Sequence, residues 1–164
     1  MVIISAIFIA PNAGQPMIQK DCVKALPKIG LEGDRYALGL GAYSKSVPAK
    51  TRDISIITRD GIDAANQELN ALGLEEFLDS DTRRNIVIKG FSSEDLNALV
   101  GQEFYLGKLK LRATELCIPC ERPSKLAMKN NFLKAFEGRG GIRAQILEAG
   151  EIKLGDRLSK TLAI

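Results

Sequence analysis

Two cysteines separated by two residues, Cys117 and Cys120, are the side chains in this sequence best suited to nucleophilic or metal chemistry. Pro119 lies between them and Pro123 follows shortly afterwards. Because proline lacks an amide proton and has a fixed φ, a strand that reaches this point must end and turn. A thiol at the end of a rigid strand is held in position and is open to a ligand. This segment is therefore the candidate reactive centre.

The sequence contains no histidine, which limits the chemistry that the thiols can take part in. Ser-His-Asp triads, Cys-His pairs and His-ligated metal sites are all excluded. Cys117-x-x-Cys120 is only half of a four-cysteine zinc site, and Cys22 cannot complete it without a histidine, so no zinc is expected. A reactive thiolate would have to be activated by Arg or Lys, by backbone dipoles or by a metal.

Three interpretations of the two thiols are open. A strand followed by C-x-x-C and then a helix is the thioredoxin arrangement, and it predicts a dithiol redox or redox-sensing domain. The surrounding pattern is not βαβ, however, and Pro123 shortens the following helix. A single nucleophilic or metal-ligating cysteine is the second interpretation, because soft thiolates suit soft metal centres. The third is a binding barrel without catalysis.

The thiols follow a stretch with the alternation of a half-buried strand. Leu109, Leu111 and Ala113 alternate with charged or polar residues. Further strands are predicted over residues 1–10, 17–26, 53–58, 82–90 and 142–147. Residues 100–107 lead through a glycine turn into the strand before the cysteines, and residues 150–158 form the last elements. Short strands joined by tight turns favour antiparallel pairing, and a sheet of this many strands tends to close. We expect a mostly β, barrel-like single domain over residues 1–164, with a few α-helices packed outside.

The main helix is predicted from about Gly61 to Leu72. Asp60 is expected as its N-cap or first-turn residue, and Gly73 as its C-terminal stop. A short second helix is predicted over residues 74–78. The stretch 124–136 is expected to be partly helical, and its side chains available for the core are Leu126, Leu133 and Phe136.

Arginines supply most of the remaining candidate binding groups. A guanidinium binds phosphate through a bidentate fork, so the arginines indicate an anionic ligand. The net charge of +3 and the 5% of aromatic residues fit a small anion better than a nucleic acid. Adjacent side chains on a strand point to opposite faces, so only one of Arg83 and Arg84 is expected in a given pocket. The arginines considered are Arg35, Arg84, Arg122, Arg139 and Arg143.

The turn at Asp34-Arg35 precedes a glycine-rich loop over residues 39–48. By itself this segment favours a solvated turn with a local ion pair. The alternative is an arginine at the rim of a pocket, with the loop as a lid.

The apolar N-terminal stretch 1–10 lacks the positive flank of a signal peptide and is predicted to be a buried strand. No span reaches transmembrane length, and neither a membrane nor a nucleic-acid partner is expected. Three cysteines without an export signal indicate a reducing cytoplasm.

The motifs taken together resemble the MOSC domain, a family named for the C-terminal domain of molybdenum cofactor sulfurases. The resemblance extends over residues 30–158, and the order of the motifs carries it. They are Gly33-Asp34-Arg35, residues 53–57, Arg84-Asn85 with the strand to Gly90, Val100-Gly101, Pro119-Cys120, residues 138–141 and Gly155-Asp156. Where family members often have histidine after Gly-Asp-Arg, this chain has Tyr36.

The resemblance implies a barrel-based fold and one defining cysteine, which falls on Cys120. That thiol is expected to bind the molybdenum of the molybdenum cofactor (molybdopterin) or to carry sulfur as a persulfide, in a reductase or sulfurtransferase-like module. Asn85 would contact the pterin or a backbone group, and the arginines would contact the phosphate. Expected cofactor-binding residues are Asp34, Arg35, Arg84, Asn85, Arg122, Arg139 and Arg143.

The resemblance also implies partners. A protein of the molybdenum cofactor or electron-transfer pathway is expected beside the small anionic cofactor, and a homo-oligomer is compatible with the sequence. No lysine context supports a Schiff base, so pyridoxal phosphate is not expected.

Overall fold

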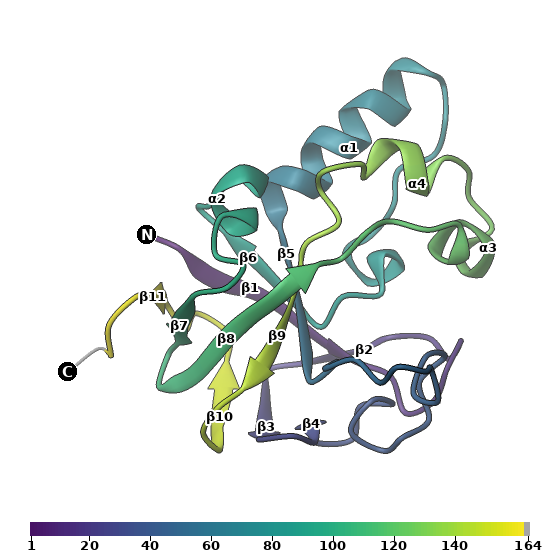
Figure 1. The fold of residues 1–164 in the computed structure, drawn as a ribbon. Coiled ribbons are helices and arrows are strands. Elements are labelled where there is room, and N and C mark those ends of the chain that lie inside the picture. The colour runs from purple at the N-terminus through teal and green to yellow at the C-terminus, as the bar shows by residue number, and fades with distance from the viewer. Residues whose placement is uncertain (163–164) are drawn as a thin grey trace.

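The computed structural model of the protein describes residues 1–162 (Figure 1). Its main feature is a curled sheet made of the strands β1 Ile3–Ile9, β2 Ile18–Lys20, β5 Ile54–Thr58, β6 Ile86–Lys89, β7 Glu103–Leu106, β8 Leu109–Leu116, β9 Ile142–Ile146 and β11 Leu158–Ser159. The strand order is β11-β7-β8-β9-β5-β6-β1-β2. The expected mostly β, barrel-like architecture is confirmed.

Backbone hydrogen bonds join the two sides of the curled sheet. Ile4 N–H donates to Asp156 O at 2.9 Å, and Gly155 N–H donates to Ile4 O at 2.9 Å. Leu158 N–H donates to Val2 O, also at 2.9 Å. The segment that leads into β11 therefore links β1 to β7. These bonds satisfy part of the unpaired edge that a curled open sheet would present.

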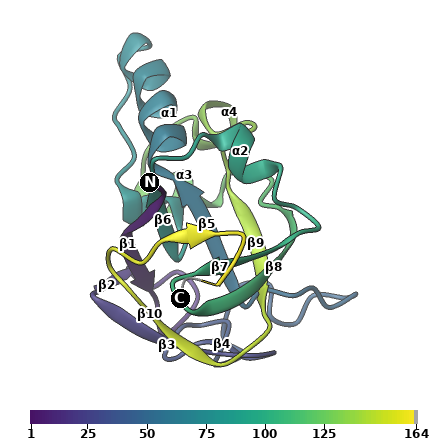
Figure 2. The same cartoon turned by 90° about the vertical axis from the view of Figure 1, so that its left-hand side faces the viewer.

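A second sheet of three strands lies below the barrel strands (Figures 1 and 2). Its strands are β3 Cys22–Leu26, β4 Gly30–Leu31 and β10 Gly150–Lys153, in the order β10-β3-β4. The single strand predicted over residues 17–26 is wrong. The chain leaves β2 at Asp21 and enters β3, which belongs to the other sheet.

The two faces of the curled sheet bury two separate cores. On β5, Ile54 and Ile56 belong to the core inside the barrel, while Ile57 belongs to the outer core. This alternation follows from the period of two of a strand. The outer face is covered by α1 Arg59–Ala71 and by α4 Phe132–Ala135 (Figure 1). Helices therefore pack outside the barrel, as the sequence predicts.

Helix α1 confirms the main helical prediction, although its N-cap is Thr58. The Thr58 hydroxyl accepts a hydrogen bond from Gly61 N–H at 2.9 Å, and Asp60 lies in the first turn. Gly73 follows the helix with a φ of +70°, which glycine adopts without strain.

The helix predicted over residues 74–78 is wrong. The Asn66 side chain of α1 bonds both the N–H of Phe77, at 2.9 Å, and its C=O, at 3.0 Å. These bonds take the place of helical ones and hold the segment extended along α1. A 3₁₀ helix, η1 Asp79–Thr82, follows.

Three short helices complete the fold: α2 Ser93–Asn97, α3 Arg122–Ala127 and the α4 already described. The stretch 124–136 is partly helical, but Met128 and Asn131 have positive φ and interrupt it. The interruption changes which side chains face inward. Phe136 is buried as predicted, whereas Leu126 and Leu133 are 39% and 44% exposed. Phe132 takes their place and stacks on Phe136, with 4.2 Å between ring centroids.

One strand pair departs from the expected antiparallel pattern. Strands β5 and β6 are parallel, because α1 carries the chain back across the outer face between them. The remaining strand pairs among the described residues are antiparallel. None of the described helices has the length and apolarity needed to cross a bilayer.

Candidate functional site

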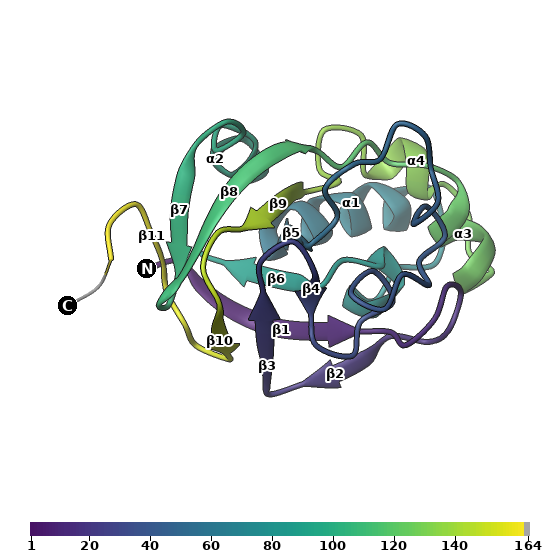
Figure 3. The ribbon, with the colours of Figure 1, turned by 60° about the horizontal axis from the view of Figure 1, so that its bottom comes forward.

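A cavity of about 90 Å³ lies at the end of the barrel where β8 ends and β6 and β9 begin. The chain between β4 and β5 lies on the same side of the barrel as α3 (Figures 1 and 3). Five of its residues line the cavity together with Cys117 and Cys120, namely Arg35, Tyr36, Ala42, Tyr43 and Arg52. Six arginines line the cavity: Arg35, Arg52, Arg83, Arg84, Arg122 and Arg143.

Carboxylates neutralise only part of this charge. Arg35 pairs with Asp34 at 3.0 Å, and Arg143 pairs with Glu115 at 2.7 Å. Within residues 1–162 no ion pair involves the other four arginines, and no acidic side chain lines the cavity. Arg84 instead donates to the carbonyl of Gly140 at 2.7 Å. We call this space the arginine cavity. Its excess positive charge suits an anion.

The electrostatics of Arg83 show how crowded these charges are. Burial, followed by the positive charges of Arg35 and Arg122, lowers the pKa of Arg83 from the usual arginine value to about 10. Arg83 is still charged at neutral pH. A bound anion would relieve the repulsion and would itself be held by these guanidinium groups.

Arg83 and Arg84 both line the cavity, so the prediction that only one of them could do so is wrong. The strand does not begin until Ile86, and Arg83 follows η1 with a φ of +64°. Side chains alternate between the two faces only within an extended strand. Arg83 and Arg84 lie in the turn before β6, so both can point into the cavity.

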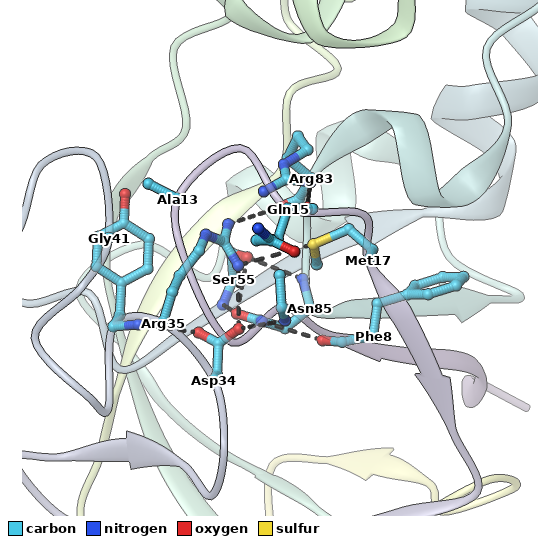
Figure 4. A network of polar contacts seen from close by, with 12 residues as sticks. Phe8, Ala13, Gln15, Met17, Asp34, Arg35, Gly41, Ser55, Arg83 and Asn85 are labelled. Carbon is cyan, nitrogen blue, oxygen red and sulfur yellow. Dashed lines mark hydrogen bonds and ion pairs between the residues drawn. The ribbon is translucent and has the colours of Figure 1, made fainter.

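Asp34 and Arg35 form a local ion pair, as expected, but the pair is buried and does not lie in a solvated turn. Asp34 is fully buried and Arg35 is 7% exposed. One carboxylate oxygen of Asp34 accepts hydrogen bonds from Ala10 N–H at 3.1 Å and from Arg35 at 3.0 Å. Arg35 in turn donates to Arg83 O at 3.2 Å (Figure 4). Asp34 does not line the cavity itself, and it positions Arg35 there.

Asn85 lines the cavity, and its side chain connects the ends of three strands (Figure 4). Its side-chain oxygen accepts from both the N–H and the hydroxyl of Ser55, each at 3.1 Å. Its side-chain nitrogen donates to Phe8 O at 3.1 Å. At 3% exposure, the amide is already engaged with protein groups on β1 and β5.

Both cysteines of the C-x-x-C segment line the arginine cavity, but their environments differ. Cys117 is buried, and its N–H donates to Gly141 O at 2.8 Å, whereas Cys120 is exposed. A Cβ at Gly140 would lie 2.1 Å from Cys117 O, so only glycine allows this close packing. Cys22 is exposed on β3 and does not line the cavity.

The predicted site residues divide as follows. Cys120, Arg35, Arg84, Asn85, Arg122 and Arg143 meet at the arginine cavity. Arg139 does not line it and pairs with Glu68 at 2.9 Å. Sequence reasoning missed Arg52 and the tyrosines Tyr36 and Tyr43, which line the cavity. They belong to an irregular stretch without periodicity, so only the folded chain brings them to the cavity.

Comparison with known proteins agrees with this geometry. The family model of the MOSC domain matches residues 40–159, which is more than half of the chain. The chain therefore belongs to the MOSC domain family. A comparison with curated proteins gave no match.

Solved structures with a similar fold include YuaD from Bacillus subtilis. Its TM-score is 0.74 at 20% identity, over 96% of this chain and 94% of that protein. YiiM from Escherichia coli has a TM-score of 0.67 at 16% identity, over 99% of this chain and 69% of that one. YiiM from Geobacillus stearothermophilus has a TM-score of 0.65 at 15% identity, over 98% and 75%. At these identities the likeness establishes the fold alone.

Replacing Asn85 by alanine is expected to lower the free energy of unfolding by about 2–4 kcal/mol. The change removes the buried partner of Phe8 O and of Ser55 N–H, which chemical denaturation would detect. Asn70→Ala, at an exposed position on α1, is the matched control and should change stability by less than about 0.5 kcal/mol. An Asn85→Ala protein as stable as wild type would contradict the role assigned to this amide.

Replacing Arg83 by glutamine is expected to raise the free energy of unfolding of the anion-free protein, by about 0.5–1 kcal/mol at low salt. The fold holds the Arg83 proton less tightly than the unfolded chain does, because its pKa is lowered to about 10. The charged form therefore costs stability at every pH below that value. The gain should shrink as salt is added.

Arg112→Gln serves as the control, because Arg112 is exposed and pairs with Glu103 at 2.6 Å. It should give no gain in stability. If Arg83→Gln destabilises the protein at low salt, the cluster is not under the repulsion described.

Proposed function

We propose that this MOSC protein binds the molybdenum cofactor at the arginine cavity and uses Cys120 in reductase or sulfur-transfer chemistry. One observation carries the proposal: arginines without carboxylate partners surround a cavity that also presents an exposed thiol. A phosphate needs the first feature and a molybdenum centre suits the second.

The side chains present fit the chemistry of this cofactor. The Cys120 thiolate is a soft donor and would be the side chain that holds the metal of the cofactor. Arg83, Arg84 and Arg122 can bind the terminal phosphate with charge-assisted hydrogen bonds. The cofactor, when bound, supplies two-electron redox chemistry at its metal.

The size of the cavity limits which part of the cofactor it takes. Sites that enclose a small organic ligand usually have about 300–1,000 Å³, and the arginine cavity has about 90 Å³. We therefore assign to it the charged part of the cofactor, next to Cys120. The remainder must occupy neighbouring space.

The other residues hold this arrangement in place. Asp34 orients Arg35, and Asn85 fixes the strand ends that carry Ser55 and Phe8. Such a module calls for a protein partner that delivers electrons, sulfur or the cofactor itself. We place its work in the cytoplasm, where Cys22, Cys117 and Cys120 would stay free thiols.

A dithiol redox function is the second candidate, because both Cys117 and Cys120 line the same cavity. It would use a reversible disulfide between the two thiols. The difference in exposure favours the single-cysteine alternative, since Cys117 is buried and its N–H bonds Gly141 O, whereas Cys120 is exposed.

The test is to express the protein in a host that makes the molybdenum cofactor and to purify it without reducing agent. Molybdenum and the fluorescent oxidised pterin are then quantified together. We expect near-stoichiometric amounts of both, and at least a tenfold loss, equivalent to about 1.4 kcal/mol, in Cys120→Ser. Cys22→Ser is the matched control, because it removes an exposed thiol elsewhere, and it should retain both.

Cys117→Ser separates the two candidates. Under the single-cysteine proposal it keeps most of the molybdenum and pterin. Equal loss in Cys117→Ser and Cys120→Ser, together with two thiols per chain lost on mild oxidation, would favour the dithiol. Neither molybdenum nor pterin in the wild-type protein, even after reconstitution, would overturn the cofactor proposal.

A further inference from the structure

A second cavity of about 350 Å³ adjoins the arginine cavity. The two cavities share three lining residues, Tyr36, Tyr43 and Arg52. These three side chains form the wall between them. Together the two spaces fall in the range of about 300–1,000 Å³ that is typical of sites enclosing a small organic ligand.

Arg52 occupies this wall without the partners that an arginine usually has. Its guanidinium carbon lies 4.9 Å from the ring centroid of Tyr43 and 5.8 Å from that of Tyr36. Its Nε is buried and has no hydrogen-bond partner. Cation–π contacts with the two rings stabilise this position of the guanidinium. The unpaired Nε–H donor destabilises it. Arg52 therefore costs less to move than an arginine whose donors are all hydrogen-bonded.

The two tyrosines differ in how firmly they are fixed. Tyr36 N–H donates to the buried Asp34 carboxylate at 3.4 Å, and the Arg35 guanidinium carbon lies 5.0 Å from the Tyr36 ring centroid. A Cβ at Gly41 would lie 2.3 Å from the Tyr36 ring, so the loop backbone packs directly on it. Tyr43 is on the same loop and is 43% exposed. The pair therefore has one fixed ring and one ring that can adjust.

We propose that Tyr36 and Tyr43 form a slot for a flat conjugated ring, and that Arg52 is a plug which the ring displaces. The inference rests on the proposed function, in which the arginine cavity takes the charged end of the same ligand. The ligand class is a heteroaromatic ring, such as a pterin, that carries a phosphate. The planar Arg52 guanidinium, which lies over the faces of both tyrosine rings, already occupies a position that such a ring could take.

The slot also explains how a small arginine cavity can serve a large ligand. Displacing Arg52 removes one of the three side chains that separate the two cavities. It also exposes the buried Nε to water, which satisfies that donor. The released guanidinium stays near the phosphate end, where its charge is favourable.

The test uses two probes that separate ring from charge. 6-Hydroxymethylpterin has the ring without phosphate, and its binding is followed by the quenching of its fluorescence. The chain contains no tryptophan to interfere with this signal. Inorganic phosphate has the charge without the ring, and its binding is followed by titration calorimetry. Thermal unfolding confirms that each variant is folded.

Two variants move the pterin affinity in opposite directions. Tyr43→Leu should weaken it about tenfold, in keeping with the loss of one stacking ring. Arg52→Ala should strengthen it, because the plug is gone. The matched controls are Tyr105→Leu and Arg112→Ala, which line neither cavity and should bind pterin like the wild type.

A Tyr43→Leu protein that binds pterin like the wild type would overturn the slot. An Arg52→Ala protein that binds pterin no more tightly than the wild type would overturn the plug. If phosphate binds and the pterin results fail in this way, this inference is wrong and the proposed function stands. If phosphate does not bind while both variants respond as described, the anion site of the proposed function is wrong and the slot stands.

Discussion

The hydrogen bonds of the Asn85 side chain hold together the strand ends from which the cavity is built. The amide bonds the backbone of β1 through Phe8 and that of β5 through Ser55, at the entry to β6. Polar groups at the ends of buried strands must find partners, and an amide offers a donor and an acceptor in one plane. Arg83 and Arg84 come directly before Asn85 in the chain, so their positions depend on this connection.

The same end of the barrel carries an electrostatic cost. Six arginines line the cavity there and only two of them pair with carboxylates. Burial, and then the positive charges of Arg35 and Arg122, lower the pKa of Arg83. A fold tolerates such a cost when packing elsewhere compensates, and here two apolar cores lie on either side of one sheet. Uncompensated charge of one sign, with a perturbed pKa, is typical of a site that binds a ligand of opposite charge.

Much of the fold could be predicted because its elements have strong local patterns. The alternation of Leu109, Leu111 and Ala113 marks β8, and all three are buried. The change of sheet at Asp21 has no such signal, because both flanking strands are extended and mixed in polarity. Leu126 and Leu133 were wrongly assigned to the core, since the helix break that turns them outward depends on local backbone geometry.

Only those site residues that stand out in the sequence itself could be predicted. Cys120 and several arginines stand out by residue type or by family resemblance. The wall formed by Tyr36, Tyr43 and Arg52 could not be predicted, because Tyr43 and Arg52 lie in an irregular loop and meet Tyr36 only in the folded chain. The difference in exposure between Cys117 and Cys120 is likewise tertiary, since it depends on packing against residues 140–141.

Thermal unfolding with and without pyrophosphate, at constant ionic strength, tests most directly whether the arginine cavity binds phosphate. The wild-type protein should be stabilised by about 2–3 kcal/mol when pyrophosphate reaches a hundred times its Kd. The double variant Arg83→Gln/Arg122→Gln should lose most of this stabilisation, while Arg112→Gln keeps it. Equal stabilisation of all three proteins, or none in the wild type, would contradict the account.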